Sequence, residues 1–302
     1  MSTTVATQVL DHLPSPQQQQ VRALVDRAHS TDRVAALNEQ ALLGLDTTGT
    51  HVLAEADGQV VGYATLADRT AQLVVDPVRR RAGLGTRLAD LLADRARAGD
   101  TTIRGWWAFG DLPGAAALAT RRGLDRVREL LRLERPIANP EPPVTPRPPE
   151  GIALRSFVPG QDDRAWLDLN ALAFKSHPEQ GRMTQDDLDA RIAESWFDPA
   201  GFLLAVDAAT PSRLRGFHWT KAEPGEPVGE VYVLGVDPAA SGQGLGGVLL
   251  EAGLAHLADR GVQTVELYVE GDNDPALKLY RRARFTTAAT DVMYAAAEEA
   301  RR

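Results

Sequence analysis

Two glycine-rich segments of this sequence have the residue types and the spacing of an anion-binding turn. RRAGLG runs from Arg80 to Gly85 and SGQGLG from Ser241 to Gly246, and each follows the tripeptide Val-Asp-Pro. Proline ends the preceding strand, and glycine lets backbone N–H groups approach a ligand without a Cβ in the way. Because the turn opens a helix, whose amino end favours negative charge, it would suit a pyrophosphate. A helix can also begin at glycine with no ligand, so a purely structural turn is the alternative.

The two turns belong to a tandem repeat. Asp237 lies 161 residues after Asp76, and Phe285 lies 161 residues after Leu124 (237 − 76 and 285 − 124). A gapless offset over about 50 residues indicates a duplicated unit.

Each copy is predicted to be an α/β unit in which the turn joins the end of a strand to a helix. In the second copy, alternating apolar residues predict strands, and apolar residues three to four apart predict helices. The expected strands are 152–157, 202–206, 214–219, 228–236 and 264–270. The expected helices are 165–174, 244–260 and 275–282.

A proline-rich segment separates the two copies. PIANPEPPVTPRPPE, from Pro136 to Glu150, is too rich in proline for a helix or a central strand, because proline fixes φ and donates no hydrogen bond. The sequence therefore predicts a first domain at 1–135, a linker at 136–150 and a second domain at 151–302.

The length and composition of the chain fit two domains and exclude several kinds of binding partner. The 302 residues include no cysteine, and the six histidines lack the spacing of a zinc helix, so we expect no metal site. The net charge of −8 argues against nucleic acid or an anionic membrane as partner. Because no apolar run approaches the ~18–20 residues of a membrane span and the amino end lacks the pattern of a secretion signal, we expect a cytoplasmic protein.

The turn matches neither a dinucleotide fingerprint nor a Walker A motif, but it resembles motif A of the GNAT acetyltransferase superfamily, Arg/Gln-x-x-Gly-x-Gly/Ala. The resemblance implies two tandem GNAT domains, each a mixed, mostly antiparallel sheet flanked by helices, that bind acetyl-CoA as the acetyl donor. The second copy departs from the motif, since Ser241 stands where Arg or Gln is usual. Because the family's contacts come mainly from backbone N–H groups, we expect binding to survive there, and the first copy keeps Arg80.

The resemblance also implies the residues that contact the coenzyme. In the second copy they are Leu234, Gly235, Val236, Ser241, Gly242, Gln243, Gly244, Leu245, Gly246, Gly247, Asn273, Asp274, Pro275, Ala276, Leu277 and Lys278. In the first copy they are Leu73, Val74, Val75, Arg81, Ala82, Gly83, Leu84, Gly85 and Thr86. Gly235 interrupts an apolar strand, which suggests a bulge or a close backbone approach, although an ordinary strand glycine is the alternative.

Two residues of the second copy could move protons. The segment DNDPALKLYRRARF resembles GNAT motif B, which implies that Tyr280 protonates the departing coenzyme A thiolate; the alternative is a core tyrosine. Asn273 would cap the helix or contact the coenzyme. Glu230 begins the strand before the turn and could accept the ammonium proton of an amine, unless it is only a solvated strand end.

The first copy lacks these groups. The 161-residue offset places Arg69 opposite Glu230, Leu112 opposite Asn273 and Ala119 opposite Tyr280. We therefore expect the first copy to bind acetyl-CoA without turning it over.

Stretches such as GFHWTK, WFDPAGFLLA and GEVYVLGVDPAA are similar to the mycothiol synthase family of tandem GNAT enzymes. That resemblance implies acetylation of the cysteinyl amine of desacetylmycothiol. It also implies substrate contacts by Glu39, Glu179, Lys221, Glu230 and Tyr268, each of which could otherwise be a surface residue. Separately, we expect the protein to be a monomer. Another amine substrate, a protein N-terminus, or a catalytically silent acetyl-CoA-binding module are the alternatives.

Overall fold

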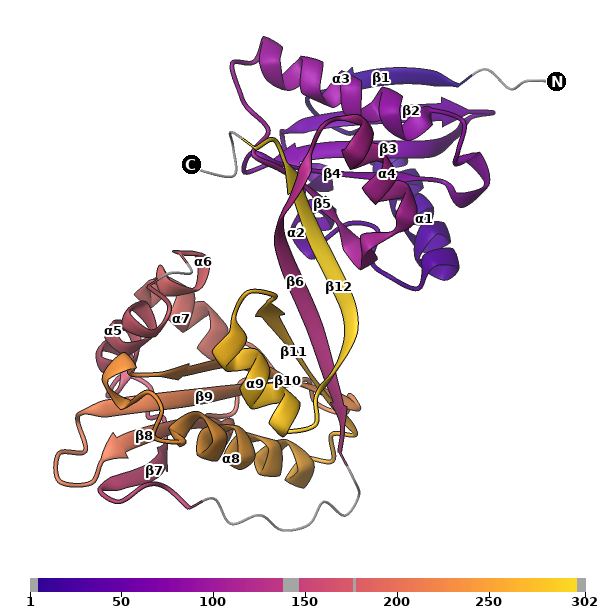
Figure 1. The fold of residues 1–302 in the computed structure, drawn as a ribbon. Coiled ribbons are helices and arrows are strands. Elements are labelled where there is room, and N and C mark those ends of the chain that lie inside the picture. Colours follow the sequence, from indigo (N-terminus) through magenta and orange to yellow (C-terminus); the bar gives the residue numbers. More distant parts are fainter. Residues whose placement is uncertain (1–4, 138–146, 176–177, 298–302) are drawn as a thin grey trace. The chain divides into compact units, whose positions relative to one another are not determined.

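The computed structural model describes residues 5–137, 147–175 and 178–297, without the side chains of residues 178 and 179. The chain divides into two compact units, whose elements Figure 1 shows. Unit 1 comprises the chain up to Leu131, Glu270–Asp272 and the chain from Ala289 onward, and unit 2 comprises Arg132–Val269 and Asn273–Ala288. Residues 138–146, the greater part of the expected linker, lie outside the described residues.

Unit 1 is built around a sheet with the strand order β1-β2-β3-β4-β5-β12. Strands β4 and β5 are parallel and the other neighbours are antiparallel. The elements of the first repeat are β1 (Ala6–Leu10), α1 (Ser15–Asp32), α2 (Glu39–Leu43), β2 (Thr50–Ala56), β3 (Gln59–Ala67), β4 (Thr70–Val75), α3 (Leu84–Ala98), β5 (Gly105–Ala108), α4 (Pro113–Arg121) and β6 (Asp125–Pro136).

Unit 2 repeats this plan with the strand order β11-β10-β9-β8-β7, in which only β10 and β11 pair in parallel. Its elements are β7 (Ile152–Ser156), α5 (Asp163–Ala173), α6 (Pro178–Gly181), α7 (Gln185–Ile192), β8 (Phe202–Asp207), β9 (Leu214–Ala222), β10 (Val228–Val236), α8 (Leu245–Asp259), β11 (Thr264–Glu270), α9 (Asp274–Arg282) and β12 (Thr286–Ala295). The expected fold class, two α/β units each with a mixed, mostly antiparallel sheet, is confirmed.

The last strand of each repeat runs out of one unit and into the other. β6 leaves unit 1 after Leu131, and its remaining residues belong to unit 2, where Arg132 bonds to β11. β12 leaves unit 2 after Ala288 and pairs antiparallel with β5 in unit 1. The two compact units therefore differ from the domains 1–135 and 151–302 that the sequence predicts. Each unit includes a strand segment from the other repeat.

Each unit has a glycine in the strand that faces its long helix, and the two glycines occupy equivalent positions. A Cβ on Gly62 of β3 would come within 2.9 Å of the Leu88 side chain of α3. A Cβ on Gly216 of β9 would come within 2.9 Å of the Leu249 side chain of α8. The absence of a side chain at each position lets the helix that follows the glycine-rich turn pack close to the strands.

Aromatic packing fixes which face of the second sheet each β9 residue occupies. Trp219 stacks on Phe202 with ring centroids 4.3 Å apart and meets Trp166 of α5 edge-on. His218 points the other way, where its Nδ1 lies 2.8 Å from the Leu249 carbonyl of α8. Because strand side chains alternate, Lys221 lies on the same face as Trp219.

Candidate active site

The two parallel strands of each unit separate shortly after they meet. β10 pairs with β11 over only three residues, from Val228–Glu230 to Thr264–Glu266, although β10 continues to Val236. β4 and β5 pair over only Thr70 and Ala71. Since parallel neighbours normally share their backbone hydrogen bonds along their whole length, this separation leaves the later part of β4 and β10 open to a ligand.

Each glycine-rich turn ends in a helix whose first N–H groups have no side-chain cap. Gly83 and Gly244 precede α3 and α8 with φ of +82° and +78°, a conformation that favours glycine. A short 3-10 turn comes before each, at Pro77–Arg79 and Pro238–Ala240. The first N–H groups of α3 and α8 therefore have no side-chain partner at the positions where the sequence motifs predict an anion.

Unit 1 contains a cavity of about 520 Å³ beside its turn. The residues that the sequence assigned to coenzyme binding in the first copy all line it, except Ala82. Trp106, Leu112, Ala119 and Tyr294 line it as well. Sequence reasoning missed Tyr294 because this residue lies on β12, and no local signal marks that strand as a partner of β5.

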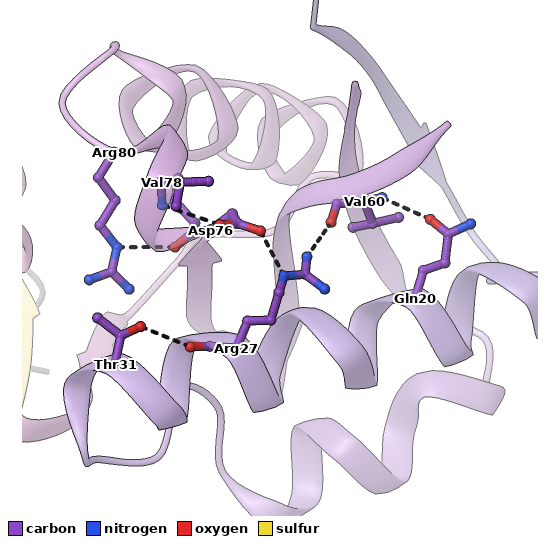
Figure 2. A network of polar contacts seen from close by, with 8 residues as sticks. Gln20, Arg27, Thr31, Val60, Asp76, Val78 and Arg80 are labelled. Atoms are coloured by element: carbon purple, nitrogen blue, oxygen red, sulfur yellow. Dashed lines mark hydrogen bonds and ion pairs between the residues drawn. The ribbon is translucent and has the colours of Figure 1, made fainter. Parts of the chain in front are cut away.

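The first turn is braced from behind by helix α1 (Figure 2). The Asp76 carboxylate accepts from Arg27 Nε at 2.8 Å and from the Val78 N–H at 3.2 Å. Arg80 donates from Nε to the Val75 carbonyl at 3.1 Å and from both terminal nitrogens to Asp32. The hydrogen bonds to Asp32 raise the pKa of Arg80, so the motif arginine serves to hold the turn against α1.

The second turn has fewer braces. Asp237 caps the Ala239 N–H at 2.9 Å and lies 3.4 Å from Arg215 Nη1. Ser241 is too short to make the contacts that Arg80 makes in the first unit. Ser241, Gly242, Gln243 and Gly244 are all exposed, so their backbone groups are accessible.

Several other coenzyme-binding predictions concern residues of the protein core. Leu245 and Leu277 are buried, and Leu245 packs against Leu249, so both could reach a ligand only through their backbone. A Cβ on Gly235 would lie 2.7 Å from the Phe217 ring, so this glycine permits a close approach. The bulge of β10 lies elsewhere, between Val231 and Val233.

Glu230 lies where β10 and β11 begin to separate. Its strand neighbours are Lys221 on β9 and Glu266 on β11. Burial raises the pKa of Glu230 to about 6; Lys221 opposes this rise and Glu266 adds to it. The residue is therefore more than a solvated strand end: it is a largely buried carboxylate that can exchange a proton near neutral pH.

Tyr280 is only 7% exposed, on the inner side of α9, and its ring meets Phe285 edge-on at 5.7 Å. Burial raises the pKa of its phenol, which keeps the group protonated across the physiological range. Asn273 caps α9 by accepting the Ala276 N–H at 3.2 Å, one of the two roles its position suggested.

The predicted substrate residues fall into three groups. Lys221 lies beside Glu230, with its Nζ 5.3 Å from the Trp196 ring centroid and 6.0 Å from that of Tyr232. Tyr268 is 49% exposed, two residues beyond Glu266 on the same face of β11. Glu39 is exposed at the start of α2 in unit 1, and the side chain of Glu179 lies outside the described residues.

The counterparts of the proton-transfer residues in unit 1 offer no acid or base. Ala119 is buried in α4, and Leu112 caps that helix with no side-chain hydrogen bond. Arg69 lies between β3 and β4 and bonds to Thr102. Within the described ranges, no cluster of three His, Asp or Glu residues could hold a metal ion, and none of the helices is long and apolar enough to cross a membrane.

Comparison with known proteins gives consistent matches over both repeats. The Acetyltransferase (GNAT) family model matches residues 15–124 and 166–285. A mycothiol acetyltransferase of Kytococcus sedentarius is 49% identical over 97% of this chain and 99% of its own length. One of Thermomonospora curvata is 50% identical over 94% of this chain and 95% of its own.

Two solved structures share the fold of the whole chain. A GCN5-related N-acetyltransferase from Sphaerobacter thermophilus, 27% identical, superposes with a TM-score of 0.73 over 95% of this chain and 94% of its own. A tandem GNAT protein from the clavulanic acid biosynthesis pathway, 22% identical, gives a TM-score of 0.68 over 96% and 98%.

Proposed function

The chain belongs to the GNAT acetyltransferases and, within them, to the family of the mycothiol acetyltransferases, and from this membership we propose that it acetylates the cysteinyl amine of desacetylmycothiol to give mycothiol. The acetyl donor is acetyl-CoA. The observation that carries the substrate assignment is 49% identity to a mycothiol acetyltransferase over 97% of this chain. Conservation of this extent over both repeats goes beyond the shared GNAT fold.

The chemical step is direct transfer in unit 2. Glu230 accepts a proton from the substrate ammonium, and the free amine nitrogen then attacks the thioester carbonyl carbon. As the new C–N bond forms, the C–S bond breaks, and the leaving thiolate of coenzyme A takes the phenolic proton of Tyr280. The nitrogen of the new amide releases its remaining extra proton to solvent, from which the Tyr280 phenolate is reprotonated. The backbone of Leu234, Gly235 and Val236 faces the thioester arm, and the uncapped amino end of α8 holds the pyrophosphate.

The burial of Glu230 suits this role. An α-ammonium group has a pKa of about 8, and a carboxylate whose pKa is about 6 is a much closer match than one at 4.5. Each pKa unit by which the difference between the ammonium and the carboxyl group narrows lowers the free-energy cost of the proton transfer by about 1.4 kcal/mol. At neutral pH the group is still mostly ionised and ready to accept a proton.

The first unit is a coenzyme-binding half without turnover in this proposal. Its cavity and braced turn favour binding, whereas Ala119 and Arg69 stand where Tyr280 and Glu230 stand in the second. The functional domains are then residues 1–135 and 151–302, joined by the linker at 136–150. A monomeric cytoplasmic enzyme, with a small-molecule amine as substrate and neither metal nor nucleic acid, completes the proposal.

The assay that tests this function offers the purified chain acetyl-CoA with desacetylmycothiol, free cysteine, an aminoglycoside and a peptide with a free N-terminus. Products are followed by mass, because the substrate's own thiol would react with a thiol reagent. We expect acetylated desacetylmycothiol to form with the highest kcat/KM. Preference for another amine would contradict the substrate, and binding of acetyl-CoA with no product from any amine would indicate a silent module.

A further inference from the structure

Four charged side chains cross one face of unit 2 in a row. Lys221 of β9 is the strand partner of Glu230 of β10, and Glu230 is the strand partner of Glu266 of β11. The row ends at Arg132 of β6, whose Nη1 lies 2.9 Å from Glu266 Oε2. Two carboxylates therefore stand side by side between two cations.

The Glu266 carboxylate is bonded to the arginine at the end of the row. Arg132 bonds to both Glu266 and Glu134, and these side chains are only 22% and 34% exposed. Burial opposes the charge of Arg132, but the hydrogen bond to Glu266 and the nearby negative groups outweigh it, so the pKa of Arg132 is raised. A guanidinium bonded at this distance makes a charge-assisted hydrogen bond that holds the Glu266 side chain in place.

Adjacent carboxylates do not ionise independently. When one of them has a fixed cationic partner, that one keeps its negative charge, and the neighbour takes up a proton more readily. Glu266 has the arginine, and Glu230 lies at the point where β10 and β11 separate. Burial is the largest cause of the raised pKa of Glu230, and the neighbouring Glu266 carboxylate adds to it.

We propose that Glu266, fixed in place by Arg132, is a positioning residue whose charge makes Glu230 an effective acceptor for the substrate's ammonium proton. The inference rests on the proposed function, because it assigns a role to two residues that act through Glu230 and do not touch the reacting atoms. Arg132 belongs to β6, so the catalytic unit depends on a residue from the first repeat. The sequence-based second domain, 151–302, does not contain it.

The charged and titratable groups around this row act on Glu230 or on Arg132, or bond to a neighbouring side chain. Lys221 from β9 acts against proton uptake by Glu230, and Glu266 from β11 acts in its favour. Tyr268 of β11 and Glu134 of β6 act on Arg132. From α7, Arg191 donates from Nε to the Tyr232 hydroxyl at 2.7 Å.

The test compares the pH profiles of kcat/KM for four variants of the full chain. Glu266→Gln removes the neighbouring negative charge, so the acid limb that reports Glu230 should move to lower pH by about 0.5–1 unit. Arg132→Gln removes a positive charge from beside the two carboxylates, so the pair takes up its first proton at a higher pH and the same limb should move to higher pH. The limb due to the substrate amine should not change, because the substrate is the same.

Glu270→Gln is the matched control. Glu270 accepts from Arg128 Nη2 at 2.6 Å, which gives an ion pair between the same two strands, four residues from Glu266. This variant should leave the acid limb unmoved. If the Arg132–Glu266 pair had a purely structural role, the two variants of the pair would lose stability without a shift of the acid limb, or would shift the limb in the same direction.

Opposite shifts in Glu266→Gln and Arg132→Gln would support the proposal, and parallel shifts or none would overturn it. Glu266→Asp, which keeps the charge, should restore the profile. A thermal melt and titration with coenzyme A establish that each variant is folded. If the wild-type chain acetylates no amine, the proposed function fails; if it does so but the limb is the same in every variant, only this inference fails.

Discussion

Glu230 acquires its properties from its neighbours on the sheet and from burial, because an isolated glutamate titrates too low to match an amine. A carboxylate is costly to bury in its charged form, and burial is the largest cause of its raised pKa. Nothing in the local sequence around Glu230 marks this environment. The strand register that places Lys221 and Glu266 on either side of it is a property of the sheet.

Replacing Glu230 with Gln should slow turnover and stabilise the fold at higher pH. We expect kcat to fall roughly 10-fold or more and the acid limb near pH 6 to disappear. Because the folded-state pKa is raised, the folded state binds the proton more tightly than the unfolded state. That stability is present below about pH 4.5 and is lost as the pH rises through about 6.

The variant cannot ionise, so above pH 6 it should be more stable than the wild type by about 1–2 kcal/mol, and near pH 4 the two should be equal. Urea unfolding at pH 4 and pH 8 measures this difference. A variant that is less stable at pH 8 would show that ionised Glu230 makes favourable contacts in the folded protein.

Tyr280→Phe should separate chemistry from packing. The ring stays buried against Phe285 in the variant, so the thermal midpoint should change by no more than about 2 °C. The proton donor is lost, so kcat should fall roughly 10-fold or more. Steady-state kinetics and a thermal melt on the same preparation check both statements, and a wild-type rate would remove Tyr280 from the mechanism.

At the scale of helices and strands, the elements with strong local signals were predicted best. The helix after the second turn was expected at 244–260 and runs from Leu245 to Asp259, because a glycine with positive φ marks its start. The helix carrying Tyr280 was expected at 275–282 and runs from Asp274 to Arg282. Helix α7 was not predicted, although the capping box formed by Thr184 and Asp187 signals its start.

Substituting the glycine at the start of each long helix should distinguish the two coenzyme sites. An added Cβ at Gly83 or Gly244 would meet no atom within 4 Å, so Ala at either position adds only the strain of positive φ, about 1–2 kcal/mol. Gly244→Ala should raise KM for acetyl-CoA roughly 5-fold or more, because it distorts the turn of the catalytic unit.

Gly83→Ala is the matched control for the first unit. It should weaken one class of sites in calorimetric titration with acetyl-CoA and leave KM unchanged. If Gly83→Ala raised KM as much as Gly244→Ala, the first site would contribute to turnover, contrary to the proposed division of roles.

At the scale of the whole chain, the duplication was readable from the sequence but the exchange of strands was not. The 161-residue offset relates α3 to α8 and α4 to α9 residue for residue (245 − 84 and 274 − 113). The strand with which β12 pairs is decided by contacts with residues far away in the sequence. Thus Val292 pairs with Ala108, and Tyr294 donates to Asp111 at 2.7 Å.

Two pieces of the chain, residues 1–137 and 147–302, should be stable only together. Unit 1 needs the end of β12, which covers β5, and unit 2 needs Arg132–Pro136 of β6, which lies beside β11. A piece expressed alone would expose a long unpaired edge strand, so we expect it to aggregate or to melt well below the intact chain. Co-expressed with a tag on one piece, the two should purify as a 1:1 complex with acetyltransferase activity and separate in denaturant. A second piece that folded alone and kept full activity would show that the exchanged strands are dispensable, and with them Arg132 as the support of Glu266.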